Sequence, residues 1–413
     1  MFYKEDDWIV MTFWNSLFIA FFLLPLGINL PSPFFIASMI FGLIMMFKFR
    51  KKFVLEKSAL LFPMYFVMLA FGLLYSENLS GGLDLVQRSI SLLLFPVIFM
   101  FVKEDSASVR RLFDFLLIGL IVSFIANVVM ASQSLIAYVC KNEEINGFFS
   151  FLEVVTRDWS YFFIGSSFSG SVNSNYISIY ILLVLGYYLK NELESRIQFV
   201  VVGVLFIYLF LLASIGAYII LAMMSVLLIF NVTDKSKKYL LIIIFAMGVV
   251  LFLHNPRVAT FYHQMKSYSS VLEKVGVSSE KSRLLSWNAS TLLIKDAPLF
   301  GYGSGDANNV LFKKYEELGY FHNLKHRYNA HNQYLQSYLQ TGFIGFAILI
   351  SIFIVLAMRL KRSRNEFSVF LILFVSLLFE SMLVRFNGIV FFSIITPLLL
   401  KRRSILSSRI IRN

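Results

Sequence analysis

Long apolar runs separated by short polar connections dominate the chain. A helix that crosses a bilayer needs roughly 17–25 mainly apolar residues, and shorter runs can serve at the ends of a bundle. We therefore expect an all-α, polytopic membrane protein with about twelve transmembrane helices. The expected spans are residues 9–30, 32–48, 58–75, 88–102, 112–139, 174–189, 197–212, 214–230, 239–254, 334–358, 367–384 and 387–400.

One long polar stretch interrupts these runs. Residues 255–330 predict a large periplasmic loop, placed between nine spans in residues 1–254 and three spans with a basic tail in residues 331–413. A smaller outer loop is expected at residues 141–172. Periodicity and glycine punctuation predict structure inside the large loop. Its expected pieces are helices at Val258–Val275 and Ser282–Ile294, a turn at Gly301–Gly305 and a polar helix at Ala307–Leu318.

The positions of Lys and Arg predict the orientation. Cytoplasmic connections of membrane proteins are enriched in these residues, whereas long loops are translocated regardless of their charge. With both termini in the cytoplasm, the short outer connections hold only Arg88, Lys141, Arg157 and Arg385. The large loop, with its own Lys and Arg, does not overturn this assignment.

Composition agrees with a membrane protein. Charged residues make up 15% of the chain, hydrophobic residues 58%, and the mean hydropathy is +0.74; soluble domains carry about 25% charged residues. The net charge of +13 lies mostly in clusters between apolar runs, so we expect membrane lipids as partners and no nucleic acid. The single Cys140 excludes an internal disulfide and a multi-cysteine metal site. The acidic start of the chain predicts a retained first span, not a cleaved signal.

The most informative stretch is Arg327–Gly345. It places His331-Asn332 at the mouth of an expected span, where a titratable group near neutral pH meets both water and lipid. A neutral imidazole there suits proton abstraction from a sugar hydroxyl. The alternative is a histidine that only satisfies backbone groups at the helix start.

Arg283 is the second candidate. A guanidinium binds phosphate oxygens with two parallel hydrogen bonds and keeps its charge, which suits a pyrophosphate leaving group. The surrounding sequence predicts a helix lying on the membrane surface with Arg283 at its rim. The alternative is a solvated charge paired with Glu280.

Glycines in this region predict packing. The turn Gly301–Gly305 follows no expected strand and lacks a Gly-Lys-Ser or Gly-Lys-Thr continuation, so it is not a phosphate-binding P-loop. We expect it to let the backbone pass close to another element. Gly342 and Gly345 are expected to let transmembrane helices approach closely.

Other polar residues support weaker interpretations. His322, His326, Asp306 and Glu316 lack the spacing of a metal site, and we expect solvated loop residues with no metal. Glu380 and Arg385 lie in or beside the eleventh expected span, and buried ionisable groups are usually paired. They are expected to pair with each other or to face a lipid-phosphate pocket.

These motifs together resemble the C-terminal block of the O-antigen ligase and O-antigen polymerase family. The resemblance rests on a fixed order of short motifs: Ser282-Arg283, Trp287, Pro298-Leu299-Phe300-Gly301-Tyr302-Gly303, His331-Asn332 and Gly342–Gly345. It implies a glycosyltransferase of the bacterial inner membrane that uses neither a metal nor a nucleotide sugar. His331 would be the base for the acceptor hydroxyl, and Arg283 would hold the pyrophosphate of an undecaprenyl-linked glycan donor. Asn332, Trp287 and Tyr302 would line the substrate site.

The sequence departs from the family pattern at one position. Family members often carry a second Ser-Arg-Gly near the outer end of a middle span, where this chain has Ile215. Arg385, Arg88 or Arg157 is expected to supply the missing charge, with Arg385 favoured because an unpaired charge at a membrane edge would be costly.

The reaction class stays open at this point. With lipid A–core as acceptor the enzyme would be an O-antigen ligase, and with another lipid-linked repeat it would be a polymerase for O-antigen, capsule or exopolysaccharide. A polysaccharide or lipid transporter, or flippase, is the alternative without chemistry. It would predict paired inverted repeats and broken helices at the membrane midplane, neither of which is evident in the sequence.

Overall fold

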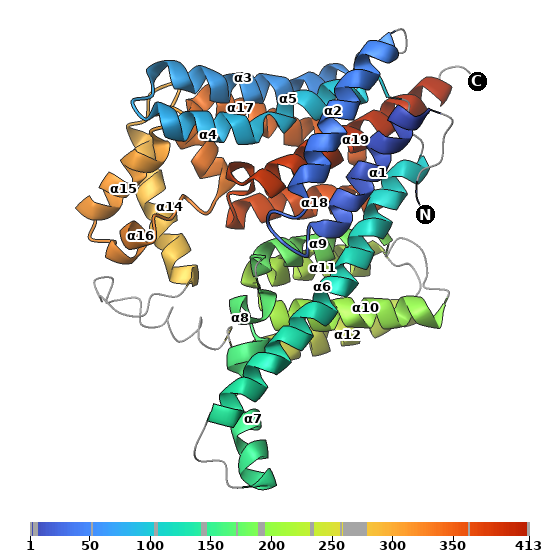
Figure 1. Cartoon of the computed structure of the whole chain (residues 1–413), viewed down its shortest axis with the longest axis vertical. Coiled ribbons are helices and arrows are strands. Elements are labelled where there is room, and N and C mark those ends of the chain that lie inside the picture. Colours follow the sequence, from blue (N-terminus) through green and yellow to red (C-terminus); the bar gives the residue numbers. More distant parts are fainter. Residues whose placement is uncertain are drawn as a thin grey trace. The chain divides into compact units, whose positions relative to one another are not determined.

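A computed structural model of the chain gives its fold in helices alone, over the residues that it describes (Figure 1). The expected all-α class is therefore confirmed for this part of the chain. The described residues are 2, 7–50, 53–102, 106–141, 147–170, 172–188, 195–231, 235–256, 258, 279–361 and 364–410.

A helix lies at each expected apolar run. In the described ranges, four helical stretches are long and apolar enough to cross a membrane, and the shorter apolar helices fall at other expected spans. The four are Lys57–Tyr75, Leu79–Phe99, Ser108–Lys141 and Gln333–Leu360. Length and apolar composition make the chain an integral membrane protein, whereas the number of crossings stays a prediction.

The chain divides into two compact units. The first contains residues 1–20, 31–112 and 267–413, and the second contains residues 21–30 and 113–266. Helices α1 and α6 each continue from one unit into the other along the chain.

The first unit carries the motifs singled out above. Its elements are α1 (Trp8–Leu23), α2 (Ser32–Lys48), η2 (Lys57–Leu60), α3 (Leu61–Phe71), η3 (Gly72–Tyr75), α4 (Leu79–Ser89), α5 (Ser91–Phe99), α14 (Ser279–Lys295), α15 (Ala307–Glu317), α16 (Phe321–Lys325), α17 (Gln333–Leu360), α18 (Arg364–Phe379), η4 (Met382–Val384) and α19 (Phe386–Ile410).

Helix α17 is the centre of this unit. It packs against α3, α14, α18 and α19, and α19 packs in turn against α5 (Figure 1). Aromatic rings fill the contacts of α17 with α18 and α19, among them Phe353, which meets Phe374 at 5.4 Å and Phe392 at 5.8 Å between ring centroids. Dense aromatic packing of this kind gives α17 a fixed position from which its first turn can present polar groups.

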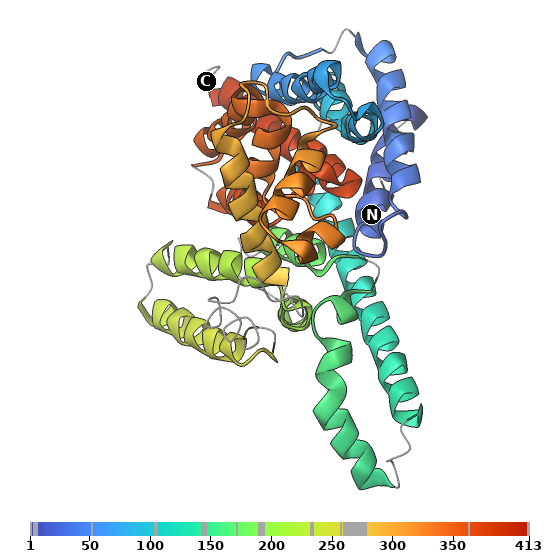
Figure 2. The ribbon, with the colours of Figure 1, turned by 90° about the vertical axis from the view of Figure 1, so that its left-hand side faces the viewer.

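The second unit consists of helices as well. Its elements are most of α6 (Ser106–Lys141), α7 (Phe148–Phe163), α8 (Ser166–Ser169), α9 (Ser174–Tyr188), α10 (Arg196–Leu212), α11 (Ile215–Asn231) and α12 (Lys235–Leu253). The end of α6 and α7 form a hairpin that extends away from α9–α12 (Figure 2). Buried Leu135, Val139 and Val154 join its two arms. The smaller expected outer loop thus contains a helix.

The boundary between α10 and α11 depends on Ala213. This residue adopts the left-handed conformation with φ +48°, and its N–H bonds the Phe210 carbonyl to close α10. A left-handed residue ends a helix because it turns the chain away from the helix axis. The expected division at residues 213–216 is therefore correct, and Ile215 opens α11.

The large loop follows its predicted pattern over the described residues. Helix α14 covers the expected Ser282–Ile294, and α15 covers almost all of the expected Ala307–Leu318. The expected helix at Val258–Val275 lies outside the described residues except for Val258 itself. Helix α16 was not predicted, because five residues are too few to show a periodic pattern.

Candidate active site

His331 lies in the connection from α16 to α17, in a strained conformation. Its φ is +47°, which is uncommon for a residue with a side chain. Three contacts hold it there. The His331 N–H donates to Asn329 Oδ1 (2.9 Å), the Trp287 indole N–H donates to the His331 carbonyl (3.3 Å), and the N–H of Ala330 donates to Gln336 Oε1 (3.0 Å).

Asn332 begins α17 as its N-cap. Its side-chain oxygen accepts hydrogen bonds from the N–H groups of Tyr334 (2.9 Å) and Leu335 (3.2 Å), donors that lack partners within the helix. The capping role considered for His331 thus belongs to Asn332, and the imidazole is not used for it. Asn332 is buried, so its expected part in substrate binding stays a prediction.

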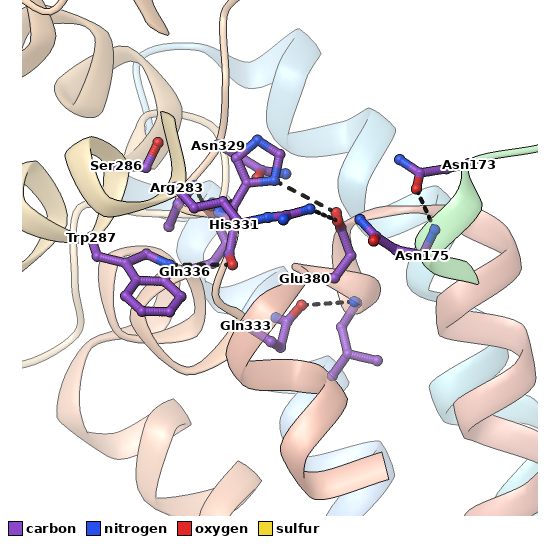
Figure 3. Close-up of polar contacts among 12 residues, drawn as sticks. Asn173, Asn175, Arg283, Ser286, Trp287, Asn329, His331, Gln333, Gln336 and Glu380 are labelled. Atoms are coloured by element: carbon purple, nitrogen blue, oxygen red, sulfur yellow. Dashed lines mark hydrogen bonds and ion pairs between the residues drawn. The ribbon is translucent and has the colours of Figure 1, made fainter. Parts of the chain in front are cut away.

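Glu380 brings His331 and Arg283 together (Figure 3). Its carboxylate lies 3.8 Å from His331 Nδ1 and 4.0 Å from Arg283 Nη2. The side chains are 2%, 16% and 12% exposed for Glu380, His331 and Arg283, respectively. A buried carboxylate is costly unless it is paired, so these contacts compensate for its burial. We call these three residues, two charged and one ionisable, the charged trio.

Gln333 fixes the segment that carries Glu380. The Gln333 oxygen accepts the N–H of Leu383 (2.7 Å), and its amide nitrogen donates to Ser337 Oγ (2.9 Å), as Figure 3 shows for the first bond. Ser337 Oγ is also 2.7 Å from the Tyr65 hydroxyl on α3. This buried chain ties the turn after α18 to the first turns of α17, where His331 precedes the helix. A fully bonded polar network of this kind makes a site rigid.

Arg283 lies on α14, which is held to α16 by Asn323. The buried Asn323 amide donates to the Ser282 carbonyl (2.8 Å) and to Ser286 Oγ (2.9 Å), one residue before and three residues after Arg283. The side chain of Arg283 is mostly buried and faces Glu380. The expected helix is thus present, and Arg283 points into the unit instead of being a solvated charge.

Arg385 and Arg88 lie near the same turn. Arg385 is exposed and attracts the Glu380 carboxylate electrostatically. Arg88, at the end of α4, binds Asp84 and donates to the Val384 carbonyl (3.1 Å). Arg157 belongs to the second unit, where it pairs with Asp158 on α7 (3.1 Å). The structure therefore places Arg385 and Arg88 at the turn that follows Glu380, and the expectation that one of them replaces the missing arginine stays a prediction.

The glycine turn supports α17 from outside. Tyr302 N–H donates to the Leu339 carbonyl (2.8 Å), and Phe343 N–H donates to the Leu299 carbonyl (3.0 Å), across a kink in α17 at Gly342 (φ +62°). A Cβ on Gly342 would lie 2.1 Å from the Leu299 oxygen, and one on Gly301 would lie 2.5 Å from the Gly342 nitrogen. The turn thus passes close to another element as expected, whereas Gly342 makes room for this turn and not for a second transmembrane helix.

Tyr302, expected in the substrate site, has a structural contact. Its hydroxyl donates to the Leu293 carbonyl (2.9 Å), which joins the glycine turn to α14. Burial and the nearby Asp296 carboxylate raise the pKa of Tyr302, so the hydroxyl stays protonated and keeps this bond. Its contribution to substrate binding remains a prediction.

The residues considered for a metal site have other contacts. Asp306 accepts hydrogen bonds from the N–H groups of Glu77 (2.6 Å) and Asn78 (2.9 Å). His322 and His326 face each other and Tyr328 through their rings. No group of three or more His, Cys, Asp or Glu able to hold a metal ion occurs in the part of the chain that the structure describes.

Comparison with known proteins agrees with this arrangement. Residues 199–350 match the family model described as O-antigen ligase. This part of the chain is similar to the O-antigen ligase family. The match covers Arg283, Trp287, the glycine turn and His331-Asn332, the motifs on which the resemblance rests.

One curated relative is an uncharacterised protein of Haemophilus influenzae. It is 25% identical over 191 residues, which cover 44% of this chain and 48% of that protein. The alignment thus spans about half of the relative's length. Its name says nothing of a substrate, so the substrate of this chain must be argued from the site.

Three site residues were not assigned their roles from the sequence. Glu380 was expected to pair with Arg385 or face a lipid phosphate, whereas it faces His331 and Arg283. Gln333 and Gln336 were not singled out. The available signal was a polar stripe at the start of an apolar helix, because Gln333, Gln336, Ser337 and Gln340 share one helix face at this spacing and are all buried.

Proposed function

We propose that this chain is an O-antigen ligase-like glycosyltransferase of the bacterial inner membrane. It would move a glycan from undecaprenyl pyrophosphate to a hydroxyl of lipid A–core at the outer face of the membrane. The observation that carries the proposal is the charged trio: a histidine and an arginine, both mostly buried, meet at one carboxylate. A general base next to a fixed guanidinium is the arrangement that transfer from a pyrophosphate requires.

In this mechanism His331 activates the acceptor. Its imidazole takes the proton of the acceptor hydroxyl as the oxygen forms a bond to the anomeric carbon of the donor sugar. The bond from that carbon to the pyrophosphate oxygen breaks on the opposite face, so the configuration inverts. Glu380 would hold the ring through Nδ1 and stabilise the imidazolium that forms, which leaves Nε2 for the acceptor.

Arg283 would stabilise the leaving group. Negative charge grows on the bridging oxygen as the glycosidic bond breaks, and a prepositioned guanidinium stabilises it in a largely buried site. Arg385 adds a second positive charge near Glu380 and would replace the arginine absent at Ile215. We propose that these arginines, without a metal ion, offset the pyrophosphate charge.

Deletion of the gene tests this function. The surface glycans of the deletion strain would be compared on gels with those of the parent and of strains complemented with wild type or His331→Ala. A ligase predicts loss of lipid A-linked polymer and accumulation of lipid-linked polymer, restored only by wild type. A single repeat unit left on the core would show a polymerase instead. An unchanged ladder, or rescue by His331→Ala, would contradict glycan transfer by this site and leave a transport role.

A further inference from the structure

A run of four aromatic rings leads away from the charged trio. The ring of His331 meets Tyr328 edge to face at 5.1 Å between centroids. Tyr328 stacks on His326 at 5.4 Å with an interplanar angle of 17°, and His326 meets His322 at 4.6 Å. We call these four residues the ring run. Only His331 among them has a part in the mechanism above.

The ring run leads from a buried end to an exposed end. Glu380 and Arg283, at the His331 end, are mostly buried, whereas Tyr328 is half-buried and His326 is exposed. Glu380 follows the apolar helix α18, while His326 directly follows α16 in the large loop. A lipid-anchored donor must stay at the apolar end. The lipid part of the acceptor stays in the membrane as well, so its glycan would reach His331 from the exposed end, along these rings.

The scaffold holds the ring run in a fixed position. Buried Asn323 joins α16 to α14 on both sides of Arg283, and its carbonyl accepts the N–H of Tyr328 (3.1 Å). The Tyr315 hydroxyl bonds Ser286 Oγ (2.8 Å), and burial raises the pKa of Tyr315 to about 12, so this bond persists at neutral pH. The rings are thus preorganised relative to the proposed leaving-group arginine, as efficient binding requires.

We infer that His322, His326 and Tyr328 form the binding subsite for the acceptor glycan and hold a pyranose ring of the acceptor beside His331. Sugar rings have apolar C–H faces and polar edges, and binding sites combine aromatic surfaces with a few hydrogen-bonding groups. The imidazole and phenol side chains supply both an aromatic surface and hydrogen-bonding groups. The inference rests on the proposed function only in that His331 acts on the acceptor and not on the donor.

Mutual packing is the alternative role for these rings. If they only stabilise α16, their replacement should lower the melting temperature and weaken the binding of donor and acceptor alike. If they bind a sugar, replacing an exposed ring should leave the melting temperature unchanged and weaken only the binding of the acceptor. His326 separates the two roles best, because it is the exposed member of the ring run.

The test measures binding without transfer. Purified full-length protein in nanodiscs would be titrated by calorimetry with two oligosaccharides from the source bacterium. One is released from its lipid A–core, and the other is the repeat unit released from its polyprenyl pyrophosphate. The variants are His326→Gln, which keeps hydrogen bonding without a ring, and His326→Trp, which keeps an aromatic ring. His254→Ala, an exposed histidine of the second unit, is the matched control.

The inference predicts that wild type binds one of the two oligosaccharides. His326→Gln should bind it at least about fivefold more weakly at an unchanged melting temperature, while His326→Trp and the control bind as wild type does. The oligosaccharide that binds identifies the acceptor source. Binding by neither, or equal binding by His326→Gln, would overturn the inference. Ring-dependent binding in a protein that transfers no glycan would refute the proposed function alone.

Discussion

The imidazole Nδ1 of His331 lies 3.8 Å from Oε1 of Glu380, so a histidine at the start of one apolar helix meets a carboxylate at the end of the next. This contact places a carboxylate beside Nδ1 of the imidazole ring. It also explains how a carboxylate persists with 2% of its side chain exposed, because His331 and Arg283 both face it.

Replacing Glu380 by Gln should lower the rate of transfer. The amide keeps the shape but cannot stabilise an imidazolium, so we expect kcat to fall about 10-fold or more with a smaller change in acceptor KM. Glu380→Asp, which keeps the charge, should retain more activity. The measurement is steady-state transfer in proteoliposomes together with thermal unfolding. Equal rates for Glu380→Gln and wild type would remove Glu380 from the mechanism.

Replacing Arg283 by Lys should impair donor use. Lysine keeps the charge, but its ammonium group cannot form the planar bidentate hydrogen bonds that a guanidinium makes with phosphate oxygens. We expect transfer to fall about 10-fold or more. Arg385→Ala should weaken donor use less, since Arg385 is exposed. Full activity of Arg283→Lys, measured against donor concentration, would contradict bidentate binding at this position.

Much of the fold followed from the sequence because the bilayer restricts the options. Apolar runs of spanning length predict helices, and their positions agree with the observed helices even where only Ala213 separates two of them. Helices α14 and α15 carried periodic patterns and were also predicted. Helix α16 and the helix α7 in the smaller loop were not, since one is too short for periodicity and the other lies in a stretch of mixed polarity.

The site was only partly predictable. His331 and Arg283 were identified from local motifs, because each motif is contiguous. Their meeting at Glu380 depends on how α17 packs against α14 and α18, and no local pattern encodes that contact. The tie from Gln333 to Leu383 is equally long-range. Pairing between Glu380 and Arg385 was expected from closeness in sequence, whereas burial and packing placed the carboxylate against His331 and Arg283.

Replacing Gly342 by Ala should destabilise the protein. The added Cβ would clash with the Leu299 oxygen, which costs about 1–3 kcal/mol, and the left-handed backbone costs about 1–2 kcal/mol more for a residue with a side chain. Gly203→Ala in α10, with nothing within 4 Å of its Cβ, is the matched control. Thermal unfolding in detergent should show a lower melting temperature for Gly342→Ala only. Equal melting temperatures would mean that the packing of the glycine turn against Gly342 does not stabilise the protein.

His322 should make the stability of the large loop sensitive to acid. Burial, followed by the charges of His326 and Lys325, lowers the pKa of His322 from 6.5. Protonation is therefore less favourable in the folded than in the unfolded state, so the stabilisation present above pH 6.5 is lost as the pH falls below it. Between pH 7.5 and 5.5 the melting temperature should fall more for wild type than for His322→Asn. The same fall in both would contradict a lowered pKa.

Transfer by purified protein tests whether His331 is the base of the reaction. Full-length wild type, His331→Ala and the control His254→Ala would be placed in proteoliposomes with the undecaprenyl-pyrophosphate-linked glycan and the lipid A–core glycolipid of the source bacterium. We expect wild type and His254→Ala to form the glycan–acceptor bond and His331→Ala to do so at least about 10²-fold more slowly, at an unchanged melting temperature. Transfer by His331→Ala at the wild-type rate would contradict the role of His331 as the base.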